Sequence, residues 1–70
     1  MNAEQWLTAY ADKLGTQAPT DGELETLLAL AGVAAHSSER KAAPIACWLT
    51  ARAGVDPDEA LRLAKELTDD

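Results

Sequence analysis

The stretch that decides the fold is residues 27–49, LLALAGVAAHSSERKAAPIACWL. It holds two apolar segments on either side of a short polar link, HSSERK at residues 36–41. Neither segment alternates apolar and polar residues with a period of two, and both space their apolar residues as helices do. Pro44 lies near the start of the second segment, where a helix loses nothing by the missing N–H. The stretch therefore predicts two consecutive helices joined by a polar link.

Signals for helix starts and stops extend this pattern in both directions along the chain. They are the capping-box pairs Asn2/Gln5 and Thr20/Glu23, the C-terminal glycines Gly15 and Gly54, and the Asp56-Pro57 start. Short connections make successive helices antiparallel neighbours. We predict an all-α fold, a compact bundle of four short antiparallel helices in a single domain, with helices at approximately 3–14, 21–36, 42–53 and 57–68.

Composition excludes several classes of function. The net charge of −6 argues against nucleic acid and against an anionic membrane surface as partners. The longest apolar run has nine residues, whereas a membrane span needs about 20. One cysteine, Cys47, and one histidine are too few for a disulfide or a structural zinc site. With no secretory signal at the N-terminus, we expect a cytoplasmic protein that binds no metal and no cofactor.

The second and third predicted helices are apolar on more than one face. Their expected inward stripes are Leu24, Leu27, Leu28, Ala31 and Ala35 on one, and Ala42, Ile45, Ala46, Leu49 and Ala53 on the other. Leu30 and Val33 point away from the first stripe, and Cys47 points away from the second. Either these two helices form a central pair that is buried on all sides, or Leu30, Val33 and Cys47 belong to an exposed patch that docks a partner or a second copy.

The polar link holds the chain's candidate side chains for ligand binding or catalysis. The N-terminus of the following helix, together with Arg40, is one arrangement that binds a phosphate. The structural alternative is that His36 favours the dipole at a helix C-terminus, while Ser37 or Ser38 caps the next helix. Adjacent Ser and His residues do not make a catalytic triad, so we predict no catalytic residues. The terminal Asp69 and Asp70 are expected to form a solvated tail.

Residues 27–49 also resemble a small actinobacterial domain of unknown function, DUF6457. The resemblance rests on Ala35-His36, Arg40 and Ala42-Ala43-Pro44, and on Trp6 and the Asp56-Pro57 helix further out. It implies a stand-alone helical protein, or a segment that follows a molybdenum-cofactor guanylyltransferase, with a link to molybdopterin cofactor assembly. The chain departs from the family pattern at Ala29 and Gly32, where members often carry acids, and at Lys41, where they often carry Pro.

These observations favour a non-enzymatic interaction domain that docks to a molybdenum-cofactor enzyme or to a second copy of itself as a homodimer. The expected contacts are Leu30 and Val33, with His36, Arg40 and Lys41 as a polar rim. The alternative is a small-ligand domain in which residues 36–41 bind a phosphate, such as that of a pterin cofactor.

Overall fold

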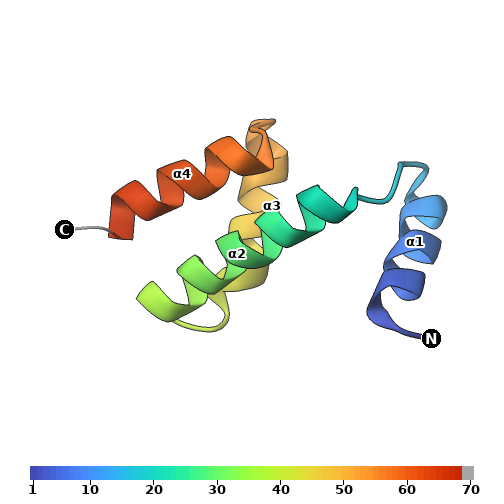
Figure 1. Ribbon diagram of the computed structural model, residues 1–70, viewed down its shortest axis with the longest axis horizontal. Helices are drawn as coiled ribbons and strands as arrows, with labels where there is room; N and C mark the ends of the chain where they lie inside the picture. The colour runs from blue at the N-terminus through green and yellow to red at the C-terminus, as the bar shows by residue number, and fades with distance from the viewer. Residues whose placement is uncertain (69–70) are drawn as a thin grey trace.

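The computed structural model describes residues 1–68 of the chain, and within that range all regular structure is helical (Figure 1). The helices are α1 (Ala3–Leu14), α2 (Asp21–Ser37), α3 (Ala42–Ala53) and α4 (Pro57–Thr68). The prediction of an all-α protein with four helices is thus confirmed, and the observed ends lie within one residue of the predicted ranges. The predicted solvated tail, Asp69 and Asp70, lies outside the described residues.

Local capping sets the starts of α1 and α2. The Asn2 side chain accepts a hydrogen bond from Gln5 N at 2.8 Å, and the Gln5 side chain accepts one from Asn2 N at 3.0 Å. Thr20 and Glu23 make the same reciprocal pair at 3.1 and 2.8 Å. Each pair satisfies two backbone N–H groups that have no partner inside the helix. Both predicted capping boxes are therefore confirmed.

Glycines end α1 and α3. Gly15 and Gly54 have φ angles of 80° and 70°, a left-handed conformation that costs other residues free energy. The chain then turns back on the helix, with Thr16 N donating to Ala11 O at 3.0 Å and Val55 N donating to Thr50 O at 3.2 Å. These bonds satisfy carbonyl groups that the last helical turn leaves free.

The tertiary packing is centred on α2, which packs closely against both α3 and α4. In Figure 1, α2 and α4 run in the same direction while α3 crosses behind α2. A hydrogen bond of 3.0 Å from Thr26 Oγ1 to Asp58 Oδ1 joins the second turn of α2 to the first turn of α4. Because α3 returns the chain between them, two helices that are not consecutive become neighbours.

Helix α1 lies apart from this three-helix unit (Figure 1). It sits near the start of α2, beyond the linker at residues 15–20, and makes no extensive packing with any other helix. One edge of α1, at Leu7 and Thr8, lies beside Pro19 and Leu24. The linker and the first turns of α2 therefore hold α1 by one narrow edge, where Ala11 is 8% exposed.

The buried face of α2 differs from the predicted one. Leu30 is the most buried large side chain, at 3% exposure, whereas Leu28 is 65% exposed. At about 100° per residue, these two leucines lie on nearly opposite sides of the helix. Helix α4 packs along the side of α2 that carries Thr26 and Val33. Leu30 lies on this same side of α2 and is therefore buried. The other four residues of the predicted inward stripe, Leu24, Leu27, Ala31 and Ala35, are half-buried, so the predicted stripe is wrong at Leu28 alone.

On α3, too, some residues predicted to face inward are exposed, and others are partly buried in their place. Its partly buried residues are Ala42, Ala43, Ala46, Cys47 and Thr50, while Ile45 and Leu49 are more than half exposed. Small alanine side chains let helix backbones approach closely, so the alanine face of α3 fits against the unit and the bulky face is left outside. The predicted inward positions of Ile45 and Leu49 are wrong for this reason. The central pair buried on all sides is not formed, because only α2 is enclosed by two neighbours.

Candidate interaction surface

The exposed side of α1 carries its largest apolar residues. Trp6, Tyr10 and Leu14 follow one another at intervals of four residues, which places them along one side of the helix. The rings of Trp6 and Tyr10 are stacked, with centroids 5.0 Å apart and an interplanar angle of 29°. Each of these three side chains is about half exposed or more. We call this set the α1 face.

A second apolar surface lies on α3 and consists of Ile45, Trp48 and Leu49, which we call the α3 face. All three are more than half exposed. The guanidinium of Arg52 lies 5.0 Å from the centre of the Trp48 ring, a cation–π arrangement that holds the indole against the helix. Aromatic, aliphatic and arginine side chains together are the composition found at the centres of protein–protein interfaces.

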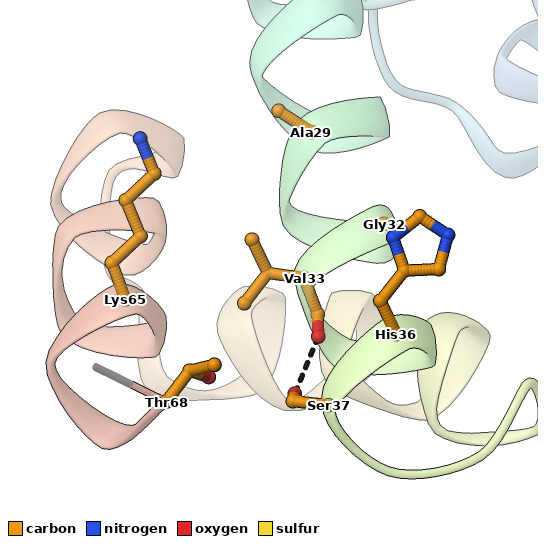
Figure 2. A pocket seen from close by; sticks show the side chains of 7 residues that line it. All are labelled: Ala29, Gly32, Val33, His36, Ser37, Lys65 and Thr68. Carbon is orange, nitrogen blue, oxygen red and sulfur yellow. Dashed lines mark hydrogen bonds between the residues drawn. The ribbon is translucent and has the colours of Figure 1, made fainter. Parts of the chain in front are cut away.

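The structure moves the expected docking patch to a different place. Leu30 is buried in the three-helix unit, so the prediction that it lies on an exposed patch is wrong. Val33 and Cys47 are only partly exposed, and Val33 projects towards α4 (Figure 2). The residues that sequence reasoning missed are those of the α1 and α3 faces. Bulky apolar residues at helical spacing mark both faces in the sequence, but the same spacing is equally typical of residues in a core.

Residues 36–41 are exposed and make mainly local contacts. Lys41 Nζ lies 3.6 Å from Glu39 Oε1, a surface pair that contributes little to stability. The hydroxyls of Ser37 and Ser38 donate back to the carbonyls of Val33 and Ala34. Neither serine caps α3, whose first residue follows Lys41 with no side-chain cap. The predicted serine cap is therefore wrong.

The N-terminus of α3 has few donors left for an anion. Ala42 N donates to Glu39 O at 2.9 Å, and Ala43 N donates to Arg40 O at 3.1 Å. The third residue, Pro44, has no N–H. An anion at a helix N-terminus is bound by free N–H groups, and the first three residues of α3 offer none. The structure therefore does not favour phosphate binding by residues 36–41.

An open cavity of about 590 Å³ lies between the last turns of α2 and α4 (Figure 2). Its lining comprises Ala29, Gly32, Val33, His36, Ser37, Lys65 and Thr68. Lys65 lines the α4 side, and in Figure 2 the imidazole of His36 points away from it. The Thr68 hydroxyl donates to Ala64 O at 3.0 Å. The two helices end here in the same direction, so their carbonyl ends favour cations such as Lys65 and oppose an anionic ligand.

The shifted pKa values lie elsewhere, on the exposed side of α4. Arg62 Nε donates to Glu59 Oε1 at 2.9 Å, and this hydrogen bond lowers the pKa of Glu59 below its ordinary value. The same contact raises the pKa of Arg62, which also pairs with Glu66. Spacings of three and four residues along one helix account for this cluster as a surface ion-pair network.

The model of DUF6457, a domain of unknown function, matches residues 1–70. The chain belongs to the DUF6457 family. No curated protein and no solved structure matches the chain.

In this DUF6457 domain, the residues that carry the family resemblance lie close to the turn from α2 to α3. His36 is in the last turn of α2, Arg40 is in the link, and Pro44 is in the first turn of α3. All three are exposed. Groups of three or more potential metal ligands do not occur among residues 1–68, and no helix in that range is long and apolar enough to cross a bilayer.

Proposed function

We propose that this DUF6457 domain is a non-enzymatic protein-interaction domain whose contact surface consists of the α1 face and the α3 face. The observation that carries the proposal is the placement of six large apolar side chains, three of them aromatic, on the outside of two helices. Isolated exposed apolar residues are ordinary, but grouped aromatic and aliphatic residues are typical of sites that bind other proteins.

The arrangement of polar groups also supports an interaction domain. Serine and threonine hydroxyls at residues 37, 38, 50 and 68 are bonded to carbonyls of their own helices. The carboxylates of Glu23 and Asp56 cap helices. Hydrogen bonds within the helices and at their ends therefore account for these hydroxyls and carboxylates. None of these groups is a nucleophile placed beside a general base, the pair that covalent catalysis requires.

A molybdenum-cofactor enzyme is the partner that the family resemblance implies. We take a molybdenum-cofactor guanylyltransferase as the probe, because the resemblance includes domains that follow such an enzyme in one chain. The thiol of Cys47 is free, in keeping with the cytoplasmic location predicted from the sequence.

Isothermal titration of the purified guanylyltransferase with this chain tests the proposal. Leu49→Glu on the α3 face is expected to weaken binding by about 30-fold or more, since a charge in the centre of an apolar contact costs several kcal/mol. Leu67→Glu is the matched control, because Leu67 is 89% exposed on α4, outside both faces. Equal affinities for the Leu49→Glu and Leu67→Glu variants would overturn the proposed surface, and no binding by the wild-type chain would overturn the proposed partner.

A further inference from the structure

The single chain exposes more surface than a packed protein of its size. Its accessible surface is 5563 Å² for a mass of 7.4 kDa. A folded monomer of this mass exposes about 4,200 Å². The radius of gyration of 12.6 Å likewise exceeds the roughly 11 Å expected for 70 packed residues. The excess area of about 1,400 Å² is more than the ~800 Å² that each partner buries in a standard protein–protein interface.

The excess accessible surface includes two apolar surfaces that lie on different helices. The α1 face and the α3 face each present a row of large side chains about one helix wide. The position of α1 leaves both uncovered, because α1 is held by its Leu7 and Ala11 edge rather than by its aromatic side. If α1 moved to cover α3 of its own chain, it would give up the contact at that edge. A second copy can cover the α1 face while the edge contact stays in place.

We propose that two copies of the chain form a dimer in which the α1 face of each copy packs on the α3 face of the other. This rests on the proposed function and names a second copy as a partner of the same surface. A two-fold axis makes the contact occur twice, so both apolar faces of both chains are covered together. The α1 face has side chains four residues apart, and the α3 face has side chains three and four residues from Ile45, which are the spacings at which one helix packs across another. The six-residue linker at 15–20 permits this because α1 already projects away from the three-helix unit (Figure 1).

The apolar nature of the contact predicts its response to salt. Each copy carries a net charge of −6, so the two copies repel one another at long range. Salt screens that repulsion and leaves burial of apolar surface intact. The dissociation constant of the dimer is therefore expected to fall as sodium chloride is raised from 20 to about 300 mM, a range over which the screening length shortens several-fold.

Sedimentation equilibrium of the full chain tests the proposal. The wild-type chain and Leu67→Glu are expected to sediment as dimers at tens of micromolar, while Tyr10→Glu and Leu49→Glu each sediment as monomers. Because each substitution acts twice in the dimer, the dissociation constant should rise by about a thousandfold. Circular dichroism of each variant must show wild-type helicity, since both substituted side chains are about half exposed in the single chain.

Mixing the two monomeric variants distinguishes reciprocal pairing from like-with-like pairing. In an equimolar mixture of Tyr10→Glu and Leu49→Glu, one contact joins an intact α1 face to an intact α3 face and the other contact carries both substitutions. A contact already broken by one glutamate loses little more from a second, so the mixed dimer is expected to be tighter than the dimer of either variant alone. A mixture that associates no more tightly than either variant alone would contradict packing of α1 on α3. A wild-type chain that is monomeric at 1 mM would overturn the dimer, and a dimer that weakens as salt is raised would overturn the apolar contact between the α1 and α3 faces. Binding of the guanylyltransferase by a monomeric wild-type chain would overturn this inference and leave the proposed function standing.

Discussion

Replacement of Leu30 by alanine probes the packing of α2 against α3 and α4, which the sequence pattern alone left open. The substitution removes three carbon atoms from a side chain that is 3% exposed. At about 0.8 kcal/mol for each carbon returned to water, the transfer loss is about 2.4 kcal/mol. The cavity left between α2 and its neighbours adds to this, so we expect a loss of about 2.5–4 kcal/mol in the free energy of unfolding. A domain of this size has only about 3–5 kcal/mol to lose.

Leu28→Ala is the matched control on the same helix. Leu28 is 65% exposed, so its truncation returns little surface to water. The expected loss is under about 1 kcal/mol, partly offset by the higher helix propensity of alanine. Urea unfolding followed by circular dichroism at 222 nm measures both, with Leu30→Met as a volume-conserving variant that should stay folded at a cost below about 1.5 kcal/mol. A larger loss for Leu28→Ala than for Leu30→Ala would refute the packing of α2 described above.

Three further predictions concern helix ends and the surface of α4. Thr20→Ala removes a capping hydroxyl and should lower the free energy of unfolding by about 1 kcal/mol, while an unchanged urea midpoint would contradict the capping role. Gly54→Ala places a Cβ at a φ of 70°, where nothing crowds it, so thermal unfolding should show a loss of about 1–2 kcal/mol from backbone strain alone. Arg62→Gln should raise the pKa of Glu59 towards its ordinary value in an NMR titration. Because the folded-state pKa of Glu59 is depressed, its contribution to stability is present at neutral pH and declines as the pH falls through that pKa, and a pKa unchanged by Arg62→Gln would contradict the assigned cause.

The four helices and their ends follow from signals that are local in the sequence. Capping boxes at Asn2 and Thr20, and left-handed glycines at 15 and 54, act through atoms a few residues apart. Such interactions depend on local backbone geometry alone, so they can be predicted without knowledge of the fold. The same is true of Pro44, whose missing N–H restricts it to the first turn of α3.

Which face of each helix is buried depends instead on how the helices pack against one another. Helix α2 has apolar residues all round, so the pattern allowed either Leu28 or Leu30 to point inward, and the packing of α4 beside Thr26 selected Leu30. On α3, close approach through alanines left Ile45, Trp48 and Leu49 outside, although their bulk had suggested a core. The positions of the α1 and α3 faces also depend on tertiary packing. Their residues are bulky side chains excluded from the three-helix unit, and exclusion depends on where neighbouring helices lie rather than on spacing along the chain.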